Sequence, residues 1–404
     1  MRRPTWLAGC WSILLALALV ACTPGSGPTS GVGGSSAPAD PAGASGLARP
    51  ASGAPAPAAA AGDRASPAQP AASLQAVIDA ARQEGQLNLV WSDNSFGGAE
   101  GARRWADGLN RAYGLNLDVR YTPGPAPNEV ASRIAQEYQT GRPASSDVLL
   151  IGSAPLARIL PLDLLQADDW TSWAPNVRDP AFVAPGGIAV EVSMRTPGIT
   201  YNTSRVAPGD VPARLQDVLL PQYRGRLAST PYATGFNWLT TAEFWGEART
   251  REFVTQLADQ VSGLIRCGET SRIASGEFDM LALDCGGFEA LKAQRRGEPL
   301  ASAIPSDVVA ITYWYMAVPR NAAHPAAAKL WINYLLSREA QDVLWELDGQ
   351  DHYRVPGSQQ AAAIEQLTAR GAKPVEVDLA FFQRHNPEEL DRIADDMQRV
   401  MRKQ

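Results

Sequence analysis

The sequence predicts an α/β protein whose folded part has two lobes joined by two hinge crossovers. Three observations support this fold class. Apolar strands alternate with amphipathic helices from residue 73 onward, and this folded part is about twice the usual length of one domain. Extended runs that could cross between lobes occur twice, at 198–203 and 308–318. Two crossings are what a hinge requires.

The strands and helices before residue 203 predict the larger part of the first lobe. Ser73 can cap a helix that ends at Gly85, and further helices are expected at 99–113 and 129–139. Strands are expected at 87–91, 115–121 and 146–152. This β-α-β-α-β order implies a mainly parallel sheet with helices on both faces.

A second α/β set begins near Pro208. It comprises strands at 225–230 and 279–285 and helices at 238–245 and 250–260. After the second extended run come helices at 326–336 and 338–345, and Asn386 can cap a last helix. The predicted boundaries are therefore 73–202 with 312–404 for lobe 1, and 203–311 for lobe 2.

The first 72 residues predict a targeting segment and a tether. A basic start, Met1-Arg2-Arg3, precedes an apolar run at 11–20 that is too short for a membrane-spanning helix, which is typical of a secretory signal. Residues 23–72 are almost entirely Ala, Gly, Pro, Ser and Thr, a composition that cannot offset its ordering entropy. We predict a signal peptide over 1–22 and a disordered tether over 23–72.

The stretch Leu19-Val20-Ala21-Cys22 resembles a bacterial lipobox, in which the cysteine is acylated and becomes the new N-terminus. This resemblance implies that Cys22 carries a lipid that anchors the protein to the membrane. The alternative is an ordinary signal peptide that is cleaved nearby, with Cys22 incidental.

The remaining cysteines predict one disulfide. Cys10 leaves with the signal, so Cys267 and Cys285 remain, 18 positions apart, in a compartment where disulfides persist. A short helical stretch and a strand between them would let the pair close a local loop. Two buried thiols are the alternative.

Charge and histidine content argue against several partners. The formal net charge is −6 and no basic patch occurs, so nucleic acid is not an expected partner. His324, His352 and His385 lie far apart and form no metal-spaced cluster. We expect no cofactor and no metal site built from these residues.

Several segments resemble one known family. They are "GITYNT", "PARLQDVLLPQYRGRLAST" with "PYATGFNW", "IASGEFDMLALD", and "AVPRNAAHPAAAKLWINYLLSREAQ". The chain is similar to the extracytoplasmic solute-binding proteins of ABC importers, in the group that contains ferric-iron, thiamine, putrescine and aminophosphonate binders. The resemblance implies the two-lobed periplasmic-binding-protein fold of type 2, which closes on a small-molecule or ion ligand and delivers it to an ABC permease.

With the lipobox, the resemblance implies a monomer anchored by its lipid outside the cytoplasm, in the periplasm or at the cell surface. A sensor or scaffold lipoprotein of the same fold, not coupled to import, is the alternative. An enzyme is not expected, because the chain lacks a G-x-S-x-G elbow, a P-loop and an H-E-x-x-H pair.

Candidate ligand contacts follow from the rule that α/β sheets bind ligands beyond the carboxyl ends of their strands. The turn at Thr234 and Gly235 opens a helix whose free N–H groups suit an anion, although Thr234 could be a plain helix cap. The aromatic residues on the two crossings line the site or pack into the core. Arg272 is a counter-ion for an acidic ligand or a solvated charge. The predicted ligand-binding residues are Ser92, Asn94, Ser95, Ser153, Tyr201, Tyr232, Thr234, Gly235, Phe236, Asp284, Trp314 and Tyr315.

The chain departs from the iron-binding pattern of the family it resembles. Those relatives carry adjacent tyrosines after the strand that follows the Gly-Glu motif, whereas "FDMLALDCGGFEAL" follows Gly276-Glu277 here. Ferric iron prefers hard, charged oxygen ligands, so a bare-iron site would need other tyrosines with Asp93 or Asp284. This favours an organic anion as ligand and leaves ferric iron with a synergistic anion open.

Overall fold

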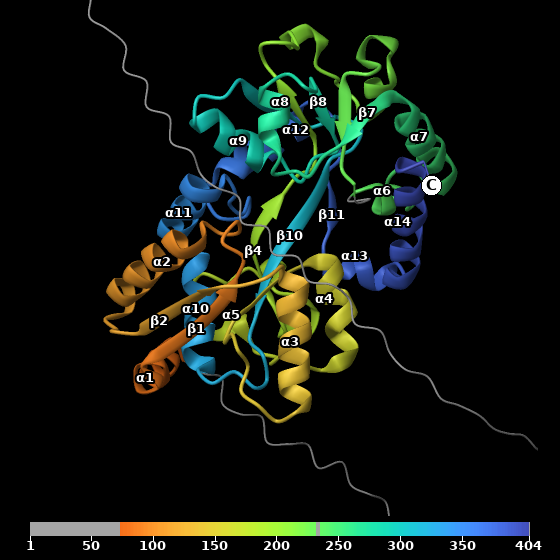
Figure 1. Cartoon of the computed structure of the whole chain (residues 1–404). Coiled ribbons are helices and arrows are strands. Elements are labelled where there is room, and N and C mark those ends of the chain that lie inside the picture. The colour runs from red at the N-terminus through yellow and green to blue at the C-terminus, as the bar shows by residue number, and fades with distance from the viewer. Residues whose placement is uncertain (1–72, 232–234, 404) are drawn as a thin grey trace, which may run out of the picture. The chain divides into compact units, whose positions relative to one another are not determined.

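The computed structural model describes residues 73–231 and 235–403. The predicted signal peptide, Cys22 and the tether lie outside the described residues, as do Tyr232 and Thr234. The described elements gather around two groups of strands, which we call the first half and the second half (Figure 1).

The strands of the first half come from both ends of the described chain. They are β1 (Gln86–Trp91), β2 (Asp118–Pro123), β3 (Leu149–Gly152), β4 (Val190–Arg195), β10 (Ala310–Ala317) and β11 (Val375–Val377). β1 pairs with β2 in parallel, whereas β10 is antiparallel to β3 and β4 and parallel to β11. The isolated bridge between Leu89 and Val148 connects β1 with the residue that precedes β3.

The strands of the second half form one sheet in the order β7-β6-β8-β5-β9. They are β5 (Ile199–Asn202), β6 (Leu227–Ser229), β7 (Val261–Leu264), β8 (Met280–Ala282) and β9 (Leu300–Ala303). β6 is parallel to β7 and β8, and β5 is antiparallel to β8 and β9.

These pairings change two expectations. The sheets are mixed rather than mainly parallel, because β5 is antiparallel to β8 and β9, and β10 is antiparallel to β3 and β4. The hydrogen bonds of β5 also place residues 199–202 in the second half, although the sequence predicted them in lobe 1. The chain therefore crosses between Arg195 and Ile199, and returns between Ala303 and Ala310.

The helices flank these strands, and several confirm the sequence expectations. Ser73 and Asn386 accept backbone N–H groups as the expected N-caps, and Gly85 ends α1 with a φ of 66°. The helices are α1 (Leu74–Glu84), α2 (Gly98–Tyr113), α3 (Pro127–Gln139), α4 (Ser153–Ile159), α5 (Trp170–Trp173), α6 (Phe236–Leu239), α7 (Glu247–Gln260), α8 (Thr270–Ala274), α9 (Phe288–Arg295), α10 (Pro325–Leu335), α11 (Arg338–Asp348), α12 (Gln359–Ala369), α13 (Leu379–Arg384) and α14 (Pro387–Met401).

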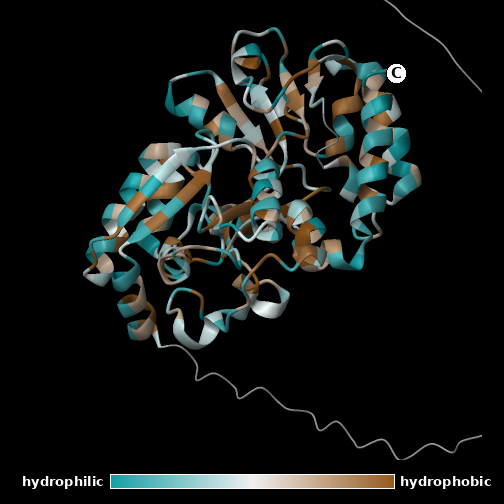
Figure 2. Cartoon of the chain, turned by 60° about the horizontal axis from the view of Figure 1, so that its bottom comes forward, coloured by the Kyte–Doolittle hydropathy of each residue, from teal (hydrophilic) through white to brown (hydrophobic). Residues whose placement is uncertain are grey.

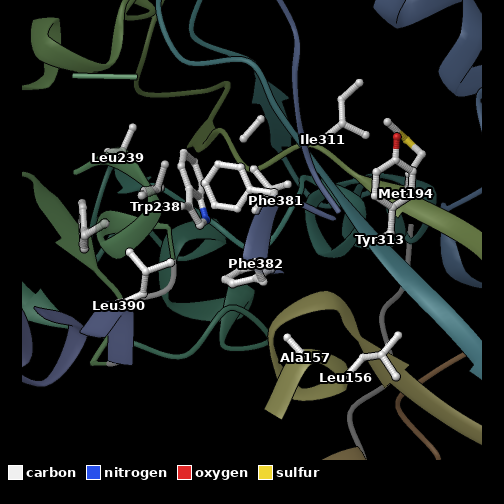
Figure 3. Close-up of a cluster of buried hydrophobic side chains, with 14 of the residues drawn as sticks. Leu156, Ala157, Met194, Trp238, Leu239, Ile311, Tyr313, Phe381, Phe382 and Leu390 are labelled. Carbon is white, nitrogen blue, oxygen red and sulfur yellow. The ribbon is translucent and has the colours of Figure 1, made fainter. Parts of the chain in front are cut away.

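One apolar cluster continues from the first half into the second. Trp238 and Leu239 of α6 lie beside Phe381 and Phe382 of α13, and Leu390 of α14 belongs to the same cluster (Figure 3). α14 packs against α7 and α6 as well as α4, so the last helix, predicted in lobe 1, covers both halves (Figure 1). We call this contact between α4, α13, α14, α6 and α7 the apolar seam.

A second cluster fills the other side of the first half, beneath α1, α2, α10 and α11. Trp91, Trp105 and Trp331 are each at most 1% exposed there, and Trp331 meets Trp91 at a tilt and Trp105 edge-on. Figure 2 shows hydrophobic residues along the strands and both hydrophilic and hydrophobic residues on the flanking helices. None of the helices described is long and apolar enough to cross a membrane.

Candidate ligand-binding site

Arg195 lies at the end of β4, where the chain leaves the first half. Its guanidinium carbon is 4.8 Å from the ring centroid of Trp314 in the first half and 5.6 Å from that of Phe288 in the second. Gly152 and Ser193 are register partners of Trp314 on the neighbouring strands. Side chains of both halves therefore meet around one cation.

The charge of Arg195 is not neutralised by an ion pair among the described residues. The carboxylates of Asp348, Asp284 and Glu289 favour its charged form from a distance, yet each of them has other partners. Burial lowers the pKa of Arg195 to about 10, so it is still a cation at neutral pH. Its Nε is buried and has no hydrogen-bond partner among the residues that the structure describes.

Lys292 of α9 connects the second half to the first beside this cation. Its Nζ lies 3.2 Å from Asp348 Oδ1 and 3.1 Å from Glu289 Oε1. Asp348 also accepts the backbone N–H of Phe96 at 3.0 Å, and burial raises its pKa. Phe96 in turn meets Trp314 edge-on, with ring centroids 6.2 Å apart.

The same helix docks on the end of α11 through polar groups. Arg295 donates to the carbonyls of Trp345 and Glu346 at 2.7 and 2.6 Å, where unpaired carbonyls of a helix C-terminus favour a cation. α9 and α11 lie side by side in Figure 1. We call the contacts of Lys292 and Arg295 with α11 the polar seam.

Asp284 organises the loop that faces Arg195. Its carboxylate accepts the N–H of Gly198 at 2.9 Å, the N–H of Gly286 at 2.8 Å and the hydroxyl of Thr200 at 2.7 Å. These bonds tie the first crossing to the β8–α9 loop. Because its oxygens are taken by the chain itself, Asp284 holds the loop in place rather than presenting a free carboxylate.

The predicted disulfide also holds this loop, because Cys285 follows Asp284 directly. Cys267 and Cys285 are joined in the structure. The next residue, Gly286, has a φ of 120°, and a Cβ there would lie 2.7 Å from Arg195 Cβ. Only glycine suits this position, because a side chain would push against the arginine stem.

Of the predicted contacts, Trp314 lies at the site and Ser92, Asn94 and Ser95 lie near it. The three polar residues form the turn between β1 and Phe96, where Ser95 N–H donates to the carbonyl of Ser92 at 2.9 Å. Ser153 begins α4 after β3, and its buried hydroxyl has no partner among the described residues. Direct ligand contact by these residues stays a prediction.

Three other predicted aromatic contacts pack against neighbouring side chains in the structure. Phe236 is fully buried and packs at a tilt against Phe253, and Tyr315 is 1% exposed and donates to Glu191 Oε1 at 2.9 Å. Tyr201 lies on β5, between β8 and β9 of the second sheet, and is partly buried against the apolar cluster. On a strand, neighbouring side chains point to opposite faces, so Trp314 reaches the site and Tyr315 does not.

Of the expected turn at Thr234 and Gly235, only Gly235 lies within the described residues, and it has a packing role. Gly235 has a φ of 89° and precedes α6, a helix of only four residues. A Cβ at Gly235 would lie 2.6 Å from Leu283 Cδ2 and 3.1 Å from the Trp238 ring. The position therefore requires glycine for fit as well as for backbone conformation.

Sequence reasoning missed the basic residues of the site. It considered only Arg272, which pairs with Glu277 at the surface. Arg195 had one signal, its place directly before the first crossing, while Lys292 reads in the sequence as an ordinary surface residue of α9.

A cavity of about 220 Å³ lies elsewhere in the first half. Glu191 borders it, 5% exposed, together with Arg354 and Tyr315. Burial raises the pKa of Glu191 to about 8. Within the described residues, no three His, Cys, Asp or Glu side chains gather closely enough to hold a metal ion.

The family follows from comparison with known proteins. The model of the family "Bacterial extracellular solute-binding protein" matches residues 157–374, which is more than half of the chain. The protein belongs to this family. This solute-binding protein thus has the fold and ancestry of extracellular transport proteins and not of enzymes.

Solved structures add the fold of type 2 periplasmic binding proteins. Iron-bound HitA from Pseudomonas aeruginosa aligns with a TM-score of 0.61 and 20% identity over 77% of this chain and 99% of its own. The binding protein AgtB of A. tumefaciens R10, in complex with agropinic acid, aligns with a TM-score of 0.59 and 18% identity over 78% of this chain and 98% of its own.

A sequence relative is the Fe(3+)-binding periplasmic protein of Serratia marcescens. It is 23% identical over 150 residues, which are 37% of this chain and 42% of the relative. The chain spans about half the length of the curated relatives it matches.

Proposed function

We propose that this solute-binding protein holds a small organic anion between its two halves, against Arg195, and delivers it to the permease of an ABC importer. The observation that carries the proposal is the guanidinium of Arg195, which is stacked between Trp314 and Phe288 without an ion-pair partner among the described residues. A partly buried cation of this kind is most stable when an anion sits beside it.

The choice of an organic anion follows from the chemistry of the site. Guanidinium groups bind carboxylate and phosphonate oxygens in a fork, and aromatic rings on either side exclude water from the contact. The rings of Trp314 and Phe288 also offer apolar surface to the carbon skeleton of a ligand. A hydrated inorganic ion would make no use of those rings.

Binding acts by closing the polar seam. A ligand shifts the balance between open and shut forms only through contacts that differ between them. α9 carries Phe288 and Lys292 to the first half, so its contacts are made in the shut form. The apolar seam buries large side chains from both halves, so we expect it to stay closed and to act as the pivot.

Ferric iron with a synergistic anion is the second candidate. HitA was solved with iron bound and the Serratia relative is named an Fe(3+)-binding protein. Tyr313 and Tyr315, which an iron site would have to recruit, are each 1% exposed in the core. An iron site would therefore depend on the anion held by Arg195 and on Tyr232.

The division into halves and the anchoring of the protein are part of the proposal. We infer lobes of 73–195 with 310–384 and of 199–303, with α14 packed on both, which follows the strand pairing. The lipobox ending at Cys22 and the tether behind it support a lipid anchor that lets a monomer reach its permease. A sensor lipoprotein of the same fold would share every feature except the permease.

A thermal-shift screen tests the proposal. The folded part, without signal and tether, is mixed with carboxylates, phosphonates, polyamines, thiamine, and ferric iron with and without carbonate or citrate. A bound ligand raises the melting temperature by mass action. We expect a shift with organic anions in the absence of metal; a shift with iron alone or with polyamines only would contradict it.

A further inference from the structure

A second buried polar group without a partner among the described residues lies on the segment that runs along β4, and it belongs to Gln350. The residue is 2% exposed, and its amide nitrogen donates to Asp348 Oδ2 at 2.8 Å. Its amide oxygen is buried and accepts no hydrogen bond from any described residue. The carboxylate that orients Gln350 is the one that Lys292 and Phe96 also contact.

Ser193 places another unpartnered oxygen in the same neighbourhood. It is fully buried, precedes Arg195 by two positions on β4 and so shares its face of the strand. Its register partner is Trp314, on which Arg195 stacks. The segment that carries Gln350 runs along this strand, since Met194 N–H donates to the carbonyl of Asp351 at 3.2 Å.

These groups together specify what a ligand must supply. A buried polar atom without a hydrogen bond costs about 1–3 kcal/mol, and native proteins contain few of them. The Nε–H of Arg195 needs an acceptor, the amide oxygen of Gln350 needs a donor, and the hydroxyl of Ser193 can serve as either. One ligand group with an acceptor and a donor on adjacent atoms would satisfy all three.

We propose that Gln350 is a specificity-determining residue that selects anions with a hydroxyl or amino group beside the charged group, such as hydroxy acids and amino acids, over bare carboxylates. The inference rests on the proposed function, because it takes Arg195 as the partner of the anionic group. The hydroxyl or amine donates to the amide oxygen of Gln350 while the anion accepts from Arg195. Asp348 fixes the amide so that its oxygen, and not its nitrogen, faces the ligand.

The docking of α9 explains how these atoms become reachable. Phe288 and Leu291 of α9 lie against Gly349, the residue next to Gln350; a Cβ on Gly349 would be 3.0 Å from Leu291 Cδ2. When the polar seam opens, α9 leaves this surface and uncovers the amide. Closure then buries the ligand's donor against Gln350, which makes the contact sensitive to a missing hydroxyl.

The test uses pairs of anions that differ only in one hydroxyl: malate with succinate, citrate with tricarballylate, and lactate with propionate. Affinities are measured by calorimetry for the folded part of the chain and for Gln350→Met, Ser193→Ala and the exposed control Gln366→Met. We expect the unmodified protein to prefer the hydroxylated member by about tenfold or more, which is 1.4 kcal/mol. In Gln350→Met this preference falls below about threefold while the bare anion keeps its affinity within about threefold.

Three outcomes would count against the role of Gln350. Equal affinity for both members of every pair in the unmodified protein overturns the role of Gln350 but leaves the proposed function intact. A preference that survives in Gln350→Met, with unchanged circular dichroism, overturns it as well, whatever Ser193→Ala shows. If none of the six anions binds the unmodified protein, this inference fails, whereas the proposed function is decided separately by the thermal-shift screen, which also contains phosphonates.

Discussion

Lys292 and Asp348 form an ion pair across the two halves, with 3.2 Å between Nζ and Oδ1, and the carboxylate is 3% exposed. Removal of Lys292 leaves a buried carboxylate short of its nearest cation, at a cost to the shut form of about 1–3 kcal/mol. The ligand-free Lys292→Met variant should therefore be open more often. We expect its radius of gyration, measured by small-angle X-ray scattering, to be larger than that of the unmodified protein.

Lys329 provides the matched control for this measurement. It pairs with Asp168 at 2.7 Å inside the first half and is buried to a similar degree. Lys329→Met is therefore expected to leave the radius of gyration unchanged. Equal expansion of both variants would mean that the polar seam does not govern opening.

The disulfide is expected to stabilise the folded part by about 3 kcal/mol, because it closes a loop of moderate length in the unfolded chain. The paired variant Cys267→Ala with Cys285→Ala should show that loss in urea denaturation. Thiol titration of the denatured, unreduced protein checks the bond itself. Two free thiols would contradict it.

Gly235→Ala is expected to lower the free energy of unfolding by more than about 2 kcal/mol. The new Cβ would meet Leu283 and Trp238, and a φ of 89° strains any residue with a side chain. Gly114→Ala is the control, since its φ is 60° but nothing lies within 4 Å of the added atom. Chemical denaturation of both variants separates the clash from the backbone strain, and equal losses would remove the packing role.

Glu191 should make stability fall as the pH rises. Burial raises its pKa from 4.5 to about 8, so between these values the folded protein holds a proton that the unfolded chain has lost. The free energy of unfolding therefore decreases through this range by up to about 1.4 kcal/mol per pH unit. The charged and titratable groups facing it are Tyr315, Arg354, His352, Glu376 and Asp378.

Glu191→Gln isolates this contribution. The amide keeps an acceptor for Tyr315 and does not titrate, and the other groups are present in both proteins. We expect the stability difference between variant and unmodified protein to grow in favour of the variant from pH 5.5 to pH 7.5 in urea denaturation. A difference that stays constant with pH would show that Glu191 keeps an ordinary pKa.

The sequence predicted most of the elements because local signals define them. Ser73 with Gly85 delimits α1, and Asn386 begins α14, as the cap residues indicate. The sequence did not predict β7, β9 or β11, which have three or four residues each and gain their pairing from neighbouring strands. It assigned residues 199–202 to lobe 1, whereas β5 pairs with β8 and β9, because alternation shows that a segment is extended but not which sheet it joins.

The site was harder to predict for a related reason. The strand-end rule led to the Asp284 loop, and the aromatic residues of the second crossing led to Trp314; both are local features. Arg195, Lys292 and Gln350 come together only through tertiary packing, from the first crossing, from α9 and from the residues after α11. Nothing in the spacing of these residues indicates that they meet.

The most direct test of the account is the affinity of Arg195→Met for the organic anion that gives the largest thermal shift. Loss of a charge-assisted contact of about 1.5–3 kcal/mol should weaken binding at least tenfold in calorimetry, with a melting temperature equal to or above that of the unmodified protein. Arg272→Met, which removes a surface arginine paired with Glu277, should bind as before. Unchanged affinity in Arg195→Met would contradict the account.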